Sequence, residues 1–252
     1  MLQRRSLIPL SFTMVALVLG AFSVLRAATG DYAASAQLIL LSMIMDGLDG
    51  KLARVLRGTS DIGAELDTFV DFTSFGLAPA VLAWLAALRD FGQIGTVLMV
   101  MIVVSGGLRL SRFRVADPHR GQHGYTGLPI TVAGGWIAAA VFLVESGALP
   151  AETFSLVRGP FAAAVWLTAL IFVLLQVSEI RFPKPTHNPA VFAIGLMAIT
   201  ALFLPRPYAA AGGLTLMFFA LYMGFIAPWL PAAATENEEE DEEPAEEPLH
   251  PL

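Results

Sequence analysis

Four aspartates stand at helical spacing in a chain that is otherwise mostly hydrophobic. Residues 46–71 read DGLDGKLARVLRGTSDIGAELDTFVD and contain Asp46, Asp49, Asp67 and Asp71. An ionisable side chain at membrane depth costs several kcal/mol unless it faces a partner, a water-filled cavity or an ion, so its presence indicates function. Four such residues in one short segment therefore predict a site where chemistry takes place.

Helical geometry places these acids on two stripes. One stripe, with the spacing i, i+3, i+4, i+7 and i+8, consists of Asp46, Asp49, Gly50, Ala53 and Arg54. The second, with the spacing i, i+4 and i+8, consists of Gly63, Asp67 and Asp71. Because only a short connection separates the two helices, we expect them to be antiparallel neighbours whose acidic stripes face one cleft.

Converging carboxylates require cations. Two carboxylates about 4 Å apart repel by about 4 kcal/mol at an effective dielectric constant near 20. The chain has no cysteine, and no pair of histidines accompanies the acids, so an all-oxygen site for Mg²⁺, Mn²⁺ or Ca²⁺ is expected. Magnesium usually shares its coordination with substrate phosphates, and the metal therefore predicts a phosphate-bearing ligand.

Small residues accompany the acids on both stripes. Gly50, Ala53 and Gly63 leave room for a bulky ligand against the backbone. Small residues at this spacing also serve close helix packing in membranes. The pattern alone does not decide between the two roles.

The composition is that of an integral membrane protein. Of 252 residues, 56% are hydrophobic and 14% charged, and the mean hydropathy is +0.68. A typical soluble domain is roughly 45 to 50% apolar and about 25% charged. The formal net charge of −6 comes from the C-terminal segment, because residues 236–247 carry nine acidic groups.

The fold class expected is all-α, a polytopic bundle of about eight transmembrane helices. Crossing the hydrocarbon takes roughly 20 helical residues. The apolar stretches that approach this length cover residues 7–28, 33–57, 62–88, 92–114, 127–147, 159–180, 189–204 and 208–230. None shows the period-two alternation that a closed barrel would need. We read residues 7–28 as a retained first helix, not as a cleaved signal peptide.

Basic residues predict the orientation. With the N-terminus in the cytoplasm, eleven of the 15 lysines and arginines flank the inner side of the spans, which places both termini and the acidic cleft there. We expect a multi-pass protein of the cell (inner) membrane, with residues 1–232 as the membrane domain. Residues 233–252 are expected to be an acidic, disordered cytoplasmic tail.

The segment also resembles a known signature. The spacing DxxDG, xxAR, eight residues and GxxxDxxxD is similar at every fixed position to that of the CDP-alcohol phosphatidyltransferase family. The resemblance implies an intramembrane transferase that cleaves a CDP-linked lipid and releases CMP. It also implies two divalent ions, Mg²⁺ or Mn²⁺, on Asp46, Asp49, Asp67 and Asp71, with Asp71 doubling as general base. Arg54 would contact a phosphate, and the cytidine would lie against Gly50, Ala53 and Gly63.

Further segments resemble the phosphatidylserine synthase branch of that family. They are DFTSFGLAPA at 71–80, GLRLSRFRV at 107–115 and YTGLPITVAGG at 125–135. The resemblance covers residues 40–135 and implies CDP-diacylglycerol as donor, L-serine as acceptor and phosphatidylserine as product in phospholipid biosynthesis. It also implies a homodimer, and we expect no nucleic-acid partner.

Two arginines follow the acidic helices. Arg109 and Arg112 stand at i and i+3 near the predicted cytoplasmic end of their span, where a guanidinium can grip a lipid phosphate or the serine carboxylate. Positive charges that only set topology are the alternative. Tyr125, Thr126 and Pro129 are expected to shape the headgroup pocket. No role is assigned to the loop residues His119 and His123.

Departures from the branch leave other acceptors open. The first helix keeps Pro9 and Thr13 but lacks the asparagines common there, and RFR at 112–114 stands where RFN is usual. Glycerol phosphate, inositol phosphate, another alcohol or an archaeal-type lipid donor are the alternatives. An ion-coupled transporter is the rival from another class, but it predicts acids scattered over several broken spans, not two adjacent helices.

Overall fold

The computed structural model describes residues 4–56, 58, 61–116, 125–150, 152–183 and 189–230. Helices occur at all eight positions that the sequence predicts. Their bounds are α1 (Leu7–Ala28), α2 (Tyr32–Val55), α3 (Asp61–Asp71), which continues through η2 (Phe72–Leu77) into α4 (Ala78–Ala86), α5 (Gly92–Ala116), α6 (Ile130–Glu145), α7 (Gly159–Val177), α8 (Pro189–Ala201) and α9 (Arg206–Leu221). Short helical turns η1 (Arg4–Ser6), η3 (Leu88–Phe91), η5 (Tyr222–Ile226) and η6 (Ala227–Trp229) complete them.

Five helical segments of the described chain are long and apolar enough to cross a membrane. They are Leu7–Ala28, Ile62–Ala86, Leu88–Arg112, Gly159–Val177 and Arg206–Trp229. At 16 and 13 residues, α6 and α8 are shorter. Charged residues interrupt the second half of α2. The all-α class is therefore confirmed, together with several candidate membrane spans, while the predicted eight crossings stay a prediction.

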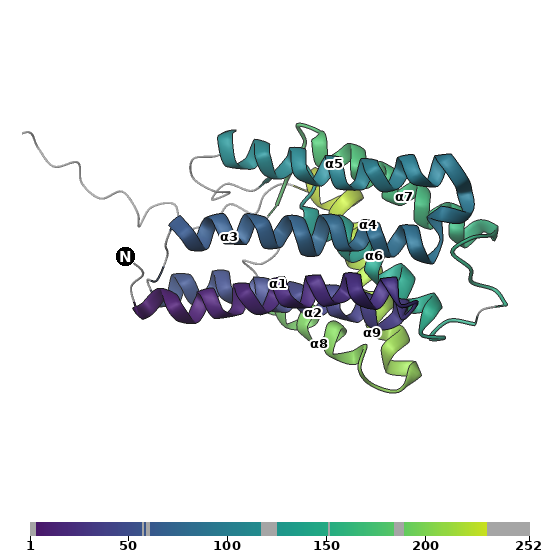
Figure 1. The fold of residues 1–252 in the computed structure, drawn as a ribbon, viewed down its shortest axis with the longest axis horizontal. Helices are drawn as coiled ribbons and strands as arrows, with labels where there is room; N and C mark the ends of the chain where they lie inside the picture. Colours follow the sequence, from purple (N-terminus) through teal and green to yellow (C-terminus); the bar gives the residue numbers. More distant parts are fainter. Residues whose placement is uncertain are drawn as a thin grey trace, which may run out of the picture.

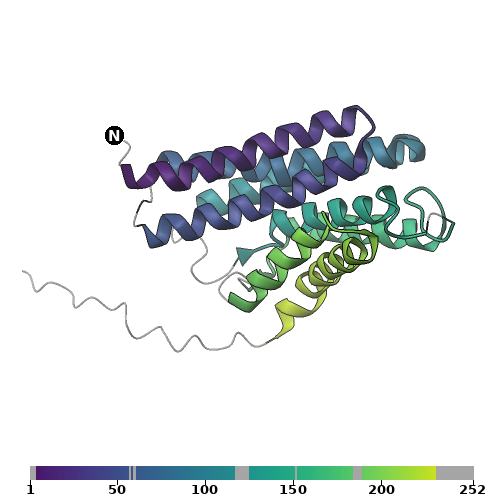
Figure 2. The ribbon, with the colours of Figure 1, turned by 90° about the horizontal axis from the view of Figure 1, so that it is seen from below.

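The helices run along one axis of the molecule. The N-terminal helices α1 and α2 form an antiparallel pair, and α3 continues beside them (Figures 1 and 2). On the opposite side from α5, α8 and α9 form a second hairpin (Figure 1). Between these groups lies α6, which packs on α2, α4 and α9 and is buried from Val132 to Leu143. The core of the bundle is therefore centred on α6.

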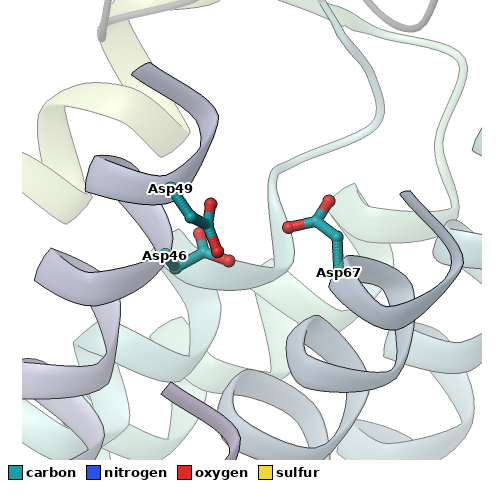
Figure 3. A group of neighbouring side chains, drawn as sticks. All are labelled: Asp46, Asp49 and Asp67. Carbon is teal, nitrogen blue, oxygen red and sulfur yellow. The ribbon is translucent and has the colours of Figure 1, made fainter. Parts of the chain in front are cut away.

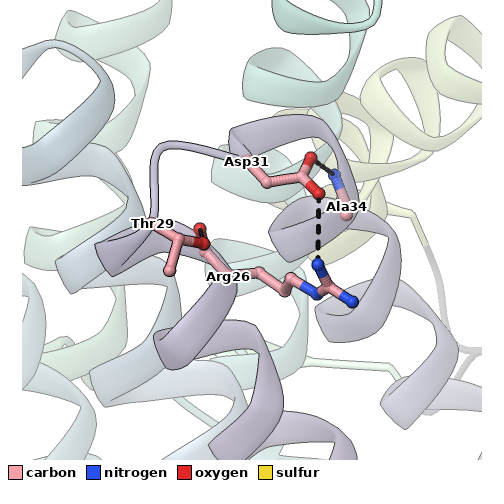
Figure 4. A network of polar contacts seen from close by, with 4 residues as sticks. All are labelled: Arg26, Thr29, Asp31 and Ala34. Carbon is pink, nitrogen blue, oxygen red and sulfur yellow. Dashed lines mark hydrogen bonds and ion pairs between the residues drawn. The ribbon is translucent and has the colours of Figure 1, made fainter.

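A tight polar turn joins α1 to α2. Asp31 caps α2 by accepting a hydrogen bond from the backbone N–H of Ala34, with a separation of 3.2 Å (Figure 4). Its second oxygen lies 3.7 Å from a guanidinium nitrogen of Arg26, and the Thr29 hydroxyl donates to the Arg26 carbonyl. Capping by aspartate satisfies an otherwise unpaired helix N–H. The turn thereby fixes the start of the helix that carries Asp46 and Asp49.

A π-helical turn directly follows Asp71. Such turns inside longer helices are common at functional sites. The Ser74 hydroxyl donates to the Ala16 carbonyl on α1, and a Cβ added at Gly20 would collide with Ser74. On its other side, a Cβ added at Gly134 of α6 would lie 2.6 Å from the Phe75 carbonyl oxygen. Close backbone contacts on two sides therefore hold η2, and with it Asp71.

A small β pair was not predicted. Tyr125–Thr126 (β1) pairs antiparallel with Arg181–Phe182 (β2). The Gly127 N–H donates to the Ile180 carbonyl, and the Leu128 N–H donates to the Leu175 carbonyl. These bonds attach the segment before α6 to the end of α7. Two residues per strand are too few to produce a recognisable alternation in the sequence.

The contact at Gly134 generates a stability prediction. Gly134→Val should lower the free energy of unfolding in detergent by about 1 to 3 kcal/mol, because the added side chain meets the η2 backbone. Gly195→Val is the matched control, since a Cβ at Gly195 has no neighbour within 4 Å. Thermal unfolding of the two variants checks this. Equal melting temperatures would show that Gly134 is not required for the packing.

Candidate active site

One cavity collects most of the residues singled out by the sequence. Its volume is about 620 Å³, within the range of roughly 300 to 1,000 Å³ usual for ligand sites. The charged side chains that line it are Asp46, Asp49, Lys51, Arg54, Asp67, Asp71 and Arg109. They come from α2, α3 and α5, so the predicted convergence of two acidic stripes on one cleft is present.

Three of the acids form a compact cluster. Asp46 and Asp49 extend from α2 toward Asp67 on α3 (Figure 3). One carboxylate oxygen from each lies within 4.8 Å of the others, a spacing that allows them to hold a common metal ion. Asp49 is buried, with 5% of its surface exposed, whereas Asp67 is open to the cavity mouth.

The chemistry of these oxygens fits a divalent cation. Asp46 Oδ1 and Asp49 Oδ2 are buried and receive no hydrogen bond from the residues that the structure describes. A buried carboxylate oxygen without a donor is costly unless an ion satisfies it. With only oxygen ligands in the cluster, Mg²⁺ or Mn²⁺ suits it better than zinc or copper. The residues present therefore match the predicted metal.

Asp71 lies beside the cluster. It lines the same cavity one turn beyond Asp67 and is close enough to repel Asp46 electrostatically. It is also close enough to Arg109 for attraction. The last aspartate of the signature thus has both the acidic cluster and the Arg109 guanidinium as electrostatic neighbours.

The two predicted arginines of α5 have different surroundings. Arg109 is buried, with 6% of its surface exposed, and lines the cavity. Arg112 does not line it. Its two terminal nitrogens donate hydrogen bonds to the carbonyls of Val177 and Ser178, at 3.1 and 3.0 Å. Arg112 therefore caps the C-terminal end of α7, where carbonyls lack helical partners.

Some of the remaining residues that the sequence predicted for the site line the cavity, and others do not. Gly50 and Arg54 line the cavity, and a Cβ at Gly50 would meet nothing within 4 Å. Ala53 and Gly63 are not among the lining residues. Pro129 lines it, whereas Thr126 is an exposed residue of β1. His119 and His123 lie outside the described residues.

Some residues of the site were missed. Lys51 is one of the eleven basic residues that predict the orientation, and no other role is expected of it from the sequence, although it lines the cavity. No role is expected of Thr13 either, which lies within hydrogen-bonding reach of the Asp49 carboxylate. The position of Lys51 inside the DGxxAR segment was the available signal. The apolar wall was not foreseen at all. It consists of side chains of α8 and α9, including Val191, Phe192, Ile194, Leu196, Ile199, Leu216 and Phe219.

The cavity lining therefore combines two kinds of side chain. Helices α2, α3 and α5 contribute the acids and arginines, and α8 and α9 contribute mostly hydrocarbon. A ligand that carries both phosphate and an aliphatic chain would match this division.

Comparison with known proteins agrees with this geometry. The profile described as CDP-alcohol phosphatidyltransferase matches residues 6–175. This segment includes all four aspartates and Arg109.

The chain belongs to the CDP-alcohol phosphatidyltransferase family. It is therefore an enzyme of phosphatidyl transfer, and the rival reading as a transporter is wrong.

Several relatives have a more specific name. The chain is 30% identical to the CDP-diacylglycerol–serine O-phosphatidyltransferase of Helicobacter pylori over 228 residues, which cover 89% of this chain and 91% of the relative. It is 32% identical to the protein of that name from Bacillus subtilis, over 58% of this chain and 72% of the relative. An archaetidylserine synthase of Methanothermobacter thermautotrophicus is 43% identical over 45% of this chain and 48% of its own length.

Metal binding to this CDP-alcohol phosphatidyltransferase should be measurable without turnover. Mn²⁺ should stabilise the folded protein by about 2.7 kcal/mol when its free concentration is about a hundred times Kd. In Asp46→Asn/Asp49→Asn the thermal shift should disappear, because the buried ligands are lost. Asp90→Asn, an exposed acid of η3, is the control. An undiminished shift in the double variant would place the metal elsewhere.

The two α5 arginines should separate in their effects. Arg109→Gln should lower turnover by about 100-fold or more, because a buried cation beside the acids is lost. Arg112→Gln should lower the free energy of unfolding by about 1 to 3 kcal/mol through the lost caps of α7. Steady-state kinetics and thermal unfolding of both variants check this. A raised KM in Arg112→Gln with an unchanged melting temperature would instead favour the predicted substrate contact.

Proposed function

We propose that this enzyme transfers the phosphatidyl group of CDP-diacylglycerol to the hydroxyl of L-serine, giving phosphatidylserine and CMP. The observation that carries the proposal is that one cavity is lined both by the carboxylate cluster and by the apolar wall of α8 and α9. A lipid diphosphate needs both surroundings at once. The names of the relatives support serine as the acceptor.

The donor is bound through its charge and its chains. Asp46, Asp49, Asp67 and Asp71 would hold two divalent ions, Mg²⁺ or Mn²⁺, which supply charge neutralisation on the diphosphate when bound. Arg54 and Arg109, both at the cavity, add hydrogen bonds to phosphate oxygens. The apolar wall of α8 and α9 excludes water and accommodates aliphatic chains.

The reaction needs a proton acceptor. The serine oxygen forms a bond to the phosphorus of the phosphatidyl group while the bond from that phosphorus to the CMP oxygen breaks. Asp71 accepts the hydroxyl proton as general base. Arg109 lies close enough to Asp71 to orient its carboxylate and to stabilise its charge before the proton arrives. The π-helical turn after Asp71 keeps this carboxylate at the cavity.

Membrane placement follows from the same proposal. We propose that the enzyme is a multi-pass protein of the inner membrane, with the acidic cluster of the cavity on the cytoplasmic side, where nucleotide-activated lipid and serine meet. The uneven distribution of basic residues supports this orientation. The homodimer and the eight crossings stay predictions, and the acidic segment 233–252 lies outside the described residues.

CMP release tests the acceptor. Purified enzyme with CDP-diacylglycerol and Mn²⁺ should release CMP when L-serine is present, and much less with glycerol 3-phosphate or inositol phosphate. Asp71→Asn should reduce the serine-dependent rate by about 10² to 10⁴-fold, because the base is lost.

The controls identify which part of the proposal has failed. Asp90→Asn should retain the wild-type rate, since this residue of η3 does not line the cavity. Release of CMP with another alcohol but not with serine would overturn the acceptor and leave the transferase chemistry intact. Unchanged turnover in Asp71→Asn would remove this residue as the base.

A further inference from the structure

A lysine of α2, the helix that carries Asp46 and Asp49, contacts an aromatic ring of α8. The ammonium nitrogen of Lys51 lies 3.2 Å from the centroid of the Phe192 ring, and both residues line the cavity. A cation over the face of an aromatic ring is attracted by the ring quadrupole, more strongly where water is excluded. This contact holds a flexible side chain in one place.

The backbone of α2 is shaped to accept that ring. Gly47 lies one turn before Lys51, and a Cβ added there would lie 3.3 Å from Phe192 Cε2. Phe192 therefore packs against the backbone at Gly47 and beneath the ammonium one turn later. Since residues i and i+4 share a helix face, one ring occupies both positions.

Lys51 lies where the charged lining from α2 meets the apolar wall of α8. Successive residues of α2 are about 100° apart around the helix axis. In order around this axis, Asp49 and Asp46 face α3, Gly50 and Arg54 come next, and Gly47 and Lys51 face α8. Phe192 belongs to the apolar wall of α8. A lipid donor whose acyl chains lie along α8 and whose nucleotide end reaches the aspartates has its phosphate between these two parts. The Lys51 ammonium lies at that position.

We propose that Lys51 binds a phosphate oxygen of the lipid donor and that Phe192 is the positioning residue that keeps its ammonium in the cavity. The inference rests on the proposed function for the identity of the donor. The ring occupies only one side of the ammonium, whose three N–H groups allow it to donate to a phosphate at the same time. Because Phe192 already holds the Lys51 side chain in place, Lys51 loses less conformational freedom when the donor binds.

This arrangement gives α8 a part in recognition. The family match ends at residue 175, before α8 begins at Pro189. Phe192 therefore contacts Lys51 on α2 from a helix that lies outside the segment matched by the family.

Donor binding in the absence of acceptor tests Lys51. CDP-diacylglycerol is titrated into detergent-solubilised enzyme at fixed Mn²⁺, and the dissociation constant is read from the ligand-induced thermal shift. Lys51→Met, which keeps most of the side-chain volume, should raise Kd about 10-fold through loss of a charged hydrogen bond. Lys51→Arg should restore binding to within about 3-fold, because the charge and the ring contact remain.

A double-mutant cycle tests the positioning role. Phe192→Leu keeps an apolar side chain but removes the quadrupole, and it should raise Kd by about 2- to 5-fold. In the Lys51→Met background the same change should add nothing, because the two residues act as a unit. Arg158→Gln, on the exposed segment before α7, and Phe203→Leu, between α8 and α9, are the matched controls and should bind like wild type.

Four results would overturn the proposal, and three of them come from the donor titration. These three are an unchanged Kd in Lys51→Met, Lys51→Arg binding as weakly as Lys51→Met, and Phe192→Leu weakening binding equally in both backgrounds. A raised KM for serine with unchanged donor binding would also overturn it, since the ammonium would then serve the acceptor carboxylate. Because the titration contains no acceptor, it stays informative even if serine is not the substrate.

Discussion

Mutual repulsion of carboxylates that line one cavity is the constraint on which the remaining structure depends. Two helices bring their acids together at a cost that bound cations would offset, so binding of the proposed metal would stabilise the bundle. The residues around the acids reflect this need. Arg109 lies beside Asp71, Arg54 and Lys51 line the same space, and the small Gly50 leaves the cavity open. The charges that the fold must accommodate are therefore the same ones to which the proposed function assigns the chemistry.

The scaffold holds this cluster by backbone contacts more than by hydrophobic burial. In a membrane the hydrophobic effect does not drive helices together, and close packing at small residues takes its place. Gly20 and Gly134 allow α1 and α6 to approach η2, so the position of Asp71 depends on residues far from it in sequence. The capped turn at Asp31 fixes the position of α2. The hydrogen bonds that Arg112 donates at the end of α7 help to fix the segment before α6, which is attached there.

The sequence predicted the parts of the site that follow from local periodicity. Helical spacing was enough to place the acids on two stripes and those stripes on one cavity, because a short connection leaves few alternatives. It was not enough for Ala53 on α2 and Gly63 on α3, which do not line the cavity, because the width of the cavity-facing part of a stripe is set by the neighbouring helices. Nor was it enough for Arg112, whose hydrogen bonds depend on how α5 and α7 pack. The contact of Phe192 with Lys51 joins residues 141 positions apart, and no local pattern encodes it. The β pair was missed for the same reason.

The shortness of α6 has a consequence for where the substrates meet. At 16 residues this helix is about 24 Å long, whereas the hydrocarbon layer is about 30 Å thick. A buried helix is sheltered from lipid by its neighbours, so it need not reach either surface. Its ends can lie in recesses sunk below the headgroups, and Pro129, just before its first residue, lines the cavity. If L-serine is the acceptor, as proposed above, it would have to enter such a recess to reach the cavity, while the lipid could keep its chains at their ordinary depth.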